Sequence, residues 1–248
     1  MALTLVIGNK NYSSWSFRPW IALRVAGIPF EEVVIPLYEP GSKEQILKYS
    51  PAGKVPVLID GDVRVWESLA IIDYLAERFP QARLWPGDAA ARAHARAIAA
   101  EMHAGFAPLR RHCPMNMWRT VKARELPPEV AADVRRIEAI VTECRERFGQ
   151  GGAQGGTQVG TQVGTQVGTQ VGTQGGAFLF GAFGAADAMY APVVARLHTY
   201  AIAVGAVAEA YKQAVMALPA WAEWRAAALK EPWIMANAEV DWPAVPRE

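Results

Sequence analysis

Short apolar runs alternate with helical patterns along the first eighty residues, and the order of these elements constrains the fold more than any other feature of the chain. Apolar and β-branched runs predict strands, and apolar residues at three- and four-residue spacing predict helices. The predicted strands lie at residues 3–7, 30–37, 55–59 and 63–66, and the predicted helices at 16–27, 42–49 and 68–79. Asp60-Gly61, between the last two strands, is typical of a tight hairpin. The resulting order is β-α-β-α-β-β-α.

Pro19 and Ser68 indicate where two of these helices begin. Proline is tolerated in the first turn of a helix, where its missing N–H has no partner to lose. We therefore expect the first helix to begin near Ser16, with Ser13 and Ser14 at or just before its N-terminus. Ser68 is expected to cap the third helix. Because a strand, a helix and a second strand form a right-handed parallel unit, the order predicts a thioredoxin-like domain whose helix N-termini and strand ends converge on one edge.

The rest of the chain predicts helices alone. We place the thioredoxin-like domain at residues 1–79, a linker containing proline and glycine at 80–87, and an all-helical domain at 88–248. Helical patterns in that domain lie at residues 88–112 with a bend near Pro108, 127–148, 187–203, 209–218 and 219–229. The pattern that begins at Asp187 is apolar nearly all round, which predicts a buried central helix. Gly184 stands at its expected cap, and Asp187 is expected to stabilise the buried turn.

A low-complexity segment interrupts the helical half at about residues 150–177. Thr-Gln-Val-Gly occurs four times in succession, at Thr157, Thr161, Thr165 and Thr169. A four-residue period matches neither a strand nor a helix face, and glycine at every fourth position opposes both. We therefore expect a flexible insertion between two helices, because long loops cost little stability. A partner-binding role is the alternative.

Charge and cysteine content exclude several classes of function. The chain has 25 basic and 24 acidic side chains, a net charge of +1, whereas nucleic-acid and membrane-surface partners demand a basic excess. Cys113 and Cys144 lack metal-ligand spacing, so a reducing compartment is expected rather than a disulfide framework or a zinc site. The N-terminus lacks the basic leader of a signal peptide, and no apolar run reaches the roughly 18 residues of a membrane span. The expectation is a soluble, cytoplasmic protein.

Three motifs stand in order inside the predicted first domain. They are Ser13-Ser14-Trp15-Ser16-Phe17-Arg18, Lys54-Val55-Pro56-Val57-Leu58 and Glu67-Ser68-Leu69-Ala70-Ile71-Ile72-Asp73-Tyr74-Leu75. Together they resemble the glutathione-binding half of cytosolic glutathione transferases, and the serine motif is most similar to the zeta and theta classes and their bacterial relatives. The resemblance covers residues 3–79 and continues more loosely to the C-terminus. It implies glutathione as co-substrate, no metal, and a homodimer.

Glutathione chemistry needs a group that stabilises a thiolate. The thiol attacks an electrophile as its anion, and lowering its pKa by two units requires about 2.7 kcal/mol of thiolate stabilisation. A hydroxyl hydrogen bond to an anion supplies roughly 1.5–3 kcal/mol, and a helix N-terminus adds roughly 0.3–1 kcal/mol. The resemblance points to Ser13 as the hydroxyl that contacts sulfur, with Ser14 as the adjacent alternative. Both serines can also be simple helix caps.

The resemblance further assigns residues that bind the rest of glutathione. Lys54 is expected to contact the glycyl carboxylate, and a cis Val55–Pro56 bond is expected to turn the Val55 backbone toward the cysteinyl residue. Glu67 is expected to receive the γ-glutamyl ammonium. Ser68 is expected to receive the γ-glutamyl carboxylate at a helix N-terminus. For Lys54 and Glu67 the alternative is an ordinary solvated charge.

An electrophile pocket is expected between the domains. Methionine and aromatic side chains suit a permissive apolar pocket. The candidates are Tyr12, Trp15, His103, Phe106, Met117 and Trp118, with Met102 and Met115 beside them. The same side chains suit a domain core equally well. Arg18 is expected to hold a carboxylate of glutathione or of the substrate, with a surface salt bridge as the alternative.

Three functions fit these residues. The leading expectation is a glutathione S-transferase that conjugates glutathione to small apolar electrophiles. The first alternative is a cis–trans isomerase of the maleylacetoacetate type, in which the thiolate adds reversibly to a double bond and Arg18 and Arg110 receive a diacid. The second alternative is a non-catalytic, transferase-like interaction module, against which the complete motifs argue.

Overall fold

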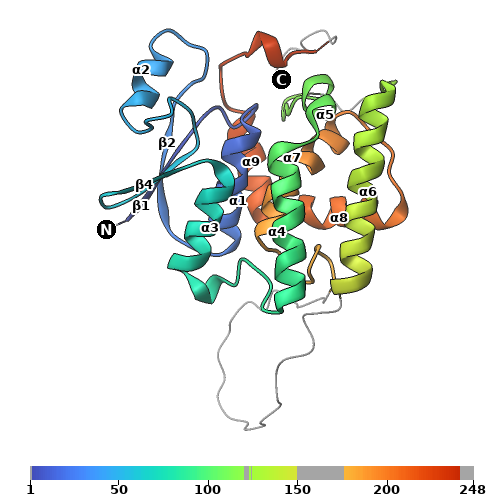
Figure 1. Ribbon diagram of the computed structural model, residues 1–248. Helices are drawn as coiled ribbons and strands as arrows, with labels where there is room; N and C mark the ends of the chain where they lie inside the picture. Colours follow the sequence, from blue (N-terminus) through green and yellow to red (C-terminus); the bar gives the residue numbers. More distant parts are fainter. Residues whose placement is uncertain (1, 120–122, 124, 150–175, 241–248) are drawn as a thin grey trace, which may run out of the picture.

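The computed structural model describes residues 2–119, 123, 125–149 and 176–240 of the chain (Figure 1). Its N-terminal part has the predicted order β1-α1-β2-α2-β3-β4-α3. The strands are β1 (Leu3–Ile7), β2 (Phe30–Val34), β3 (Val57–Asp60) and β4 (Val63–Trp66), and the helices are α1 (Ser14–Val25), α2 (Ser42–Leu47) and α3 (Ser68–Arg78). The predicted thioredoxin-like arrangement is therefore confirmed.

The sheet directs several chain connections to one edge. Its strand order is β2-β1-β3-β4, with β1 parallel to β2 and antiparallel to β3, and β3 antiparallel to β4. The carboxyl ends of β1, β2 and β4 therefore share an edge with the start of β3. The connections into α1, α2 and α3 all leave from that edge, as does the segment that enters β3.

Helices make up the rest of the described chain and lie to the right of the sheet in Figure 1. They are α4 (Ala89–Ala104), α5 (Ala107–His112), α6 (Pro128–Phe148), α7 (Ala185–Thr199), α8 (Ala206–Met216) and α9 (Pro219–Ala228), with 3-10 turns at Pro80–Ala82 and Ala236–Ala238. Helix α7 packs against α1, α4 and α8, so it joins the two parts of the molecule. The predicted all-helical second half is confirmed for the described residues.

The predicted helix at residues 88–112 is two helices. The chain breaks at Gly105 and Phe106, and Phe106 has a left-handed backbone with φ 61°. A Cβ atom at Gly105 would lie 2.8 Å from the Glu101 carbonyl oxygen, so the close return of the backbone requires glycine. Pro108 does not bend a continuous helix. It is the second residue of α5, where its missing N–H has no helical partner.

Helix α1 begins earlier than Pro19 indicates. Ser13 is the cap and Ser14 the first helical residue, so Pro19 lies inside the helix and the predicted start near Ser16 is wrong. A proline there removes one backbone hydrogen bond. Burial offsets this loss, because α1 packs against α3, α7 and α9, and side chains such as Phe17 and Trp20 are fully buried.

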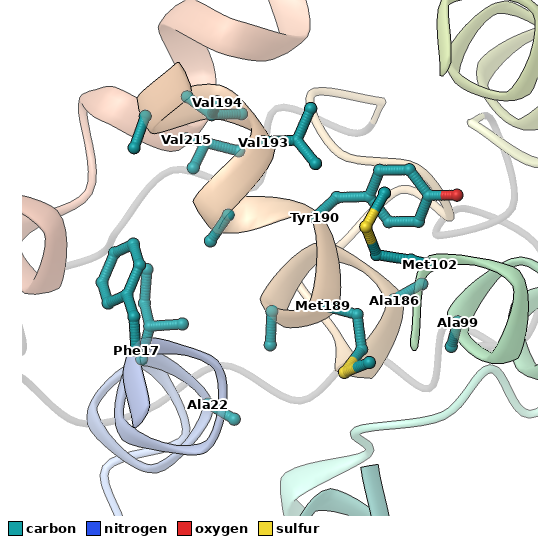
Figure 2. Close-up of a cluster of buried hydrophobic side chains, with 14 of the residues drawn as sticks. Phe17, Ala22, Ala99, Met102, Ala186, Met189, Tyr190, Val193, Val194 and Val215 are labelled. Atoms are coloured by element: carbon teal, nitrogen blue, oxygen red, sulfur yellow. The ribbon is translucent and has the colours of Figure 1, made fainter. Parts of the chain in front are cut away.

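Buried side chains of the central helix α7 pack with buried side chains of α1, α4 and α8, as Figure 2 shows. Asp187 lies in the first turn of α7 and accepts hydrogen bonds from the backbone N–H groups of Leu179 at 3.0 Å and Gly184 at 2.9 Å. A Cβ atom at Gly184 would lie 2.7 Å from the Leu84 carbonyl oxygen. Close packing therefore explains glycine at the cap, and the expected structural role of Asp187 is confirmed.

The predicted repeat insertion lies outside the described residues, apart from Gly176 and Ala177. Within the described ranges, no helix is long and apolar enough to cross a lipid bilayer. The same ranges contain no group of three or more His, Cys, Asp or Glu side chains arranged to hold a metal ion.

Candidate active site

A cavity of about 880 Å³ lies at the sheet edge where the three connections converge. Seven of the predicted site residues line it: Ser13, Trp15, Lys54, Val55, Pro56, Glu67 and Ser68. These residues come from all three sequence motifs. The motifs meet because the start of α1, the entry to β3 and the start of α3 share one edge of the sheet.

Ser13 and Ser14 occupy different environments. The Ser13 hydroxyl caps α1 by accepting from the Ser16 N–H at 3.4 Å, and Ser13 lines the cavity. Its oxygen lies 2.7 Å from the Ser16 hydroxyl, which also accepts from the Gly8 N–H at 3.1 Å. Both serines are buried, at 7% and 6% exposure, but only Ser13 is among the residues that line the cavity. The geometry therefore favours Ser13 as the hydroxyl available to a ligand.

The start of α3 presents a second polar group to the cavity. Glu67 precedes the helix in a left-handed backbone conformation with φ 71°. Such strain in a non-glycine residue is typical of ligand-binding sites. Ser68 is the first helical residue and does not cap the helix through its side chain, which corrects the prediction. Its hydroxyl accepts instead from Nη1 of Arg18 at 3.4 Å.

The segment before β3 contains the remaining residues that were predicted to bind glutathione. The Val55–Pro56 peptide bond is cis, as the resemblance implies. Lys54 and Val55 line the cavity on this side. An extended backbone next to a cavity leaves N–H and C=O groups available for strand-like pairing with a peptide ligand.

Trp15 separates the cavity from a buried arginine. Arg18 is fully buried and does not line the cavity, which differs from its expected contact with a bound carboxylate and from a surface salt bridge. Its Cζ atom lies 4.3 Å from the centroid of the Trp15 ring. The Cζ atom of Arg110 lies 5.0 Å from the same ring. Arg18 is thus placed behind the cavity wall.

His103 reaches the site from the helical half. Its ring packs edge-on against Trp15 with centroids 5.1 Å apart, and its Nε2 lies 3.6 Å from a Glu67 carboxylate oxygen. Burial and the charge of Arg18 lower the pKa of His103, while Glu67 opposes the shift. The imidazole is therefore neutral at neutral pH, and its contact with Glu67 is a polar contact rather than an ion pair.

The other predicted pocket residues lie outside the cavity. Phe106 and Met117 belong to the hydrophobic core. The Tyr12 hydroxyl donates to the Glu239 carboxylate at 2.6 Å, and burial and this carboxylate raise the pKa of Tyr12. Trp118 packs against Tyr12 with ring centroids 5.7 Å apart and donates through Nε1 to the Ala228 carbonyl at 2.7 Å. The core alternative therefore holds for Tyr12, Phe106 and Met117, whereas Trp118 is half-buried and packs outside the cavity.

Sequence reasoning missed one wall of the cavity. This wall is formed by the connection after β2, by α2 and by the end of β4, and includes Leu37, Tyr38, Glu39, Pro40, Lys43, Ile46 and Trp66. The connection follows the carboxyl end of a strand parallel to β1. That placement was the available signal, because loops at the carboxyl ends of parallel strands gather at one edge.

The C-terminal segment holds the loop that precedes Ser13. The Glu231 carboxylate accepts from the backbone N–H groups of Lys10 at 2.7 Å and Asn11 at 2.9 Å. Trp224 Nε1 donates to the Lys10 carbonyl at 2.9 Å, and the Met117 N–H donates to the Asn11 carbonyl at 3.2 Å. The backbone of this loop is therefore hydrogen-bonded by residues more than one hundred positions away.

We expect Glu231→Ala to lower the free energy of unfolding by about 2–6 kcal/mol, because each of the two buried N–H groups left without an acceptor costs about 1–3 kcal/mol. Thermal and urea unfolding measure this loss. Glu231→Gln is the matched control, since its amide oxygen still accepts one hydrogen bond, and we expect about half the loss. A Glu231→Ala protein as stable as the parent would contradict this role.

Comparison with known proteins agrees with the geometry. Residues 12–78 match the family model for the glutathione S-transferase N-terminal domain. Over 98 residues the chain is 42% identical to a probable maleylacetoacetate isomerase from Caenorhabditis elegans, covering 39% of this chain and 45% of that protein. Over 84 residues it is 42% identical to glutathione S-transferase 1 from Dianthus caryophyllus, covering 34% of this chain and 38% of that protein. These matches span less than half of either relative.

A solved structure extends the similarity to both halves of the chain. A glutathione transferase homologue from Burkholderia, with bound glutathione, superposes with a TM-score of 0.62 and 20% identity over 92% of this chain and 98% of that chain. At this identity the likeness establishes the fold.

Proposed function

We propose that the protein is a glutathione transferase that binds glutathione in the 880 Å³ cavity and transfers the glutathione sulfur to a small electrophile. The match of residues 12–78 to the glutathione S-transferase N-terminal domain and the shared fold support this proposal. One observation carries this proposal. The Ser13 hydroxyl, at the N-terminus of α1, lines the same cavity as Lys54, Val55, Glu67 and Ser68.

The cavity offers a complementary group for each end of glutathione. The ammonium of Lys54 suits the glycyl carboxylate, and the Val55 backbone suits the cysteinyl amide groups. The carboxylate of Glu67 suits the γ-glutamyl ammonium, and the N-terminus of α3 at Ser68 suits the γ-glutamyl carboxylate. This arrangement would place the sulfur toward Ser13.

The hydrogen bonds around Ser13 support ionisation of the thiol. The Ser13 hydroxyl donates to the Ser16 oxygen, which also accepts from the Gly8 N–H. Because hydroxyl protons rotate, this bond can reverse when a thiol binds, so that the Ser16 hydroxyl donates to the Ser13 oxygen. The Ser13 proton is then available to the sulfur. A hydroxyl bond of roughly 1.5–3 kcal/mol and a helix N-terminus of roughly 0.3–1 kcal/mol together supply a pKa decrease of about one to three units.

The chemical step is a nucleophilic transfer. The thiol proton passes to solvent, and the sulfur electron pair forms a C–S bond with the electrophile while the leaving group departs with its own pair. Trp15 and Trp66 line the cavity and provide apolar surface for the electrophile.

A second candidate is a glutathione-dependent cis–trans isomerase. Its support is the similarity to a probable maleylacetoacetate isomerase over 98 residues. In such a reaction the thiolate adds to a double bond, the resulting single bond rotates, and the thiolate leaves again. The positive charges of Arg18 and Arg110 behind Trp15 favour an anionic substrate.

Turnover with a panel of electrophiles tests both candidates. The panel contains an aryl halide, an epoxide, an unsaturated aldehyde and maleylacetone, each with glutathione and with cysteine as the thiol. Glutathione-dependent conjugation of the first three supports the transferase, and geometric isomerisation of maleylacetone with no net glutathione consumption supports the isomerase. Glutathione binding without any turnover would contradict both candidates and favour the non-catalytic interaction module.

A homodimer and a cytoplasmic location are part of the same proposal and rest on the family resemblance.

A further inference from the structure

Arg18 is a buried cation without a counter-charge among the described residues. Its side chain is 0% exposed, and its single hydrogen bond there joins Nη1 to the Ser68 hydroxyl at 3.4 Å. Nε and Nη2 are buried and have no hydrogen-bond partner. No described carboxylate lies within 4.0 Å of its nitrogens. Burying a charge in this way is costly unless an opposite charge compensates it.

Two further guanidinium groups share this interior. Arg196 on α7 is 4% exposed, and its Nε is also buried without a partner. Arg110 on α5 donates through Nε to the Gly105 carbonyl at 3.0 Å. Burial, then the like charges of Arg110 and Arg196, lower the pKa of Arg18, and burial and Arg110 lower the pKa of Arg196 to about 9. Arginines begin from so high a pKa that all three stay charged at neutral pH.

Two acidic groups offset part of this charge. Asp133 on α6 favours the charged form of Arg110, and Glu67 lies beside the neutral imidazole of His103. The phenol of Tyr190 acts on Arg18 and burial raises its pKa, so it carries no charge at neutral pH. Three guanidinium groups against two carboxylates leave the interior behind Trp15 net positive.

This positive interior borders the cavity directly. Trp15 and Ser68 both line the cavity, and the Arg18 guanidinium lies 4.3 Å from the ring of the first and 3.4 Å from the hydroxyl of the second. Ser13 lines the cavity two residues before Trp15. A charge separated from a cavity by one indole ring is weakly screened, because the intervening medium is protein rather than water.

We propose that Arg18, reinforced by Arg110 and Arg196, stabilises the thiolate of bound glutathione through the cavity wall. The inference rests on the proposed function. When the S–H bond breaks, the electron pair stays on sulfur and the proton passes to solvent. Arg18 acts through its field and does not touch the reacting atoms, so it complements the contact made by Ser13.

The test compares Arg18→Met with Arg24→Met. Arg24 lies on the same helix but is exposed and pairs with Glu223 at 2.9 Å, so its variant is the matched control. The measurements are the pKa of the bound glutathione thiol, followed by thiolate absorbance, and the affinity for S-methylglutathione, which has no thiol. We expect Arg18→Met to raise the thiol pKa by about one unit and to leave S-methylglutathione affinity within about twofold. Arg24→Met should change neither.

The stability of the ligand-free variant is a second readout. Replacing a buried, uncompensated charge by an apolar side chain is neutral or stabilising, so Arg18→Met should unfold at the same temperature as the parent or higher. Should it fail to fold, Arg110→Met provides the same thiol measurement with an expected rise of about half a unit.

The outcomes separate this inference from the proposed function. An unchanged thiol pKa in Arg18→Met with intact S-methylglutathione binding overturns the electrostatic role alone. Loss of S-methylglutathione binding in Arg18→Met would mean that Arg18 maintains the shape of the cavity wall, and it would also overturn the electrostatic role. Failure of the unaltered protein to bind either glutathione or S-methylglutathione would overturn the proposed function.

Discussion

Replacing Ser13 by alanine is expected to lower turnover about 10- to 100-fold, because the lost hydroxyl bond to the thiolate is worth roughly 1.5–3 kcal/mol. The pKa of the bound glutathione thiol should rise by at least one unit, since the bond favours the ionised form. Affinity for S-methylglutathione should change little, because the remaining cavity residues are intact. Steady-state kinetics and thiolate absorbance measure these effects separately.

Ser14 provides the matched control for Ser13. It is adjacent in the chain and equally buried, but it does not line the cavity. Ser14→Ala should therefore keep turnover within about threefold of the parent, an effect below 1 kcal/mol. Ser13→Thr keeps a hydroxyl and should restore much of the activity lost in Ser13→Ala. Full turnover in Ser13→Ala, or an equal loss in Ser14→Ala, would contradict the assignment of the sulfur contact to Ser13.

Replacing Asp187 by alanine is expected to cause a large loss of stability, about 2–6 kcal/mol of unfolding free energy. Its carboxylate accepts from the N–H groups of Leu179 and Gly184 at the start of the central helix. Removing both acceptors leaves two polar groups in the interior, at about 1–3 kcal/mol each. The melting temperature should fall by roughly 4–24 °C, at about 2–4 °C per kcal/mol for a chain of this size.

Asp187→Asn distinguishes lost hydrogen bonds from lost packing. Asparagine has nearly the same shape but a single acceptor oxygen. It should recover about half of the stability lost in Asp187→Ala. Equal losses in the two variants would show that the ionisable carboxyl itself, rather than its acceptor count, stabilises the turn.

The part of the site that could be predicted from sequence is the part made by local chain geometry. Ser13 at a helix start, Lys54 and Val55 before a strand, and Glu67 and Ser68 at another helix start each occupy short motifs. The sheet topology then brings them together, because the connections share one edge. The wall from Leu37 to Ile46 carries no comparable motif, so its contribution was not predicted.

The incorrect predictions concern contacts between residues that are distant in the chain. Tyr12 has the chemistry of a pocket residue, but Glu239, 227 positions away, accepts its hydroxyl proton. Arg18 has the chemistry of a carboxylate ligand, but the helical half covers α1 and buries it. Proline locally prefers the first turn of a helix, but Pro19 lies inside α1 because the tertiary packing of this helix overrides that preference. Local patterns contain no information about such partners.

The most direct test of the central claim is a titration of the unaltered protein with glutathione, following thiolate absorbance between pH 6 and 9. The account predicts saturable binding and a thiol that ionises at least one unit below the value of about 8.5 for a free thiol. Saturable binding with an unshifted thiol pKa, or no binding at all, would contradict it.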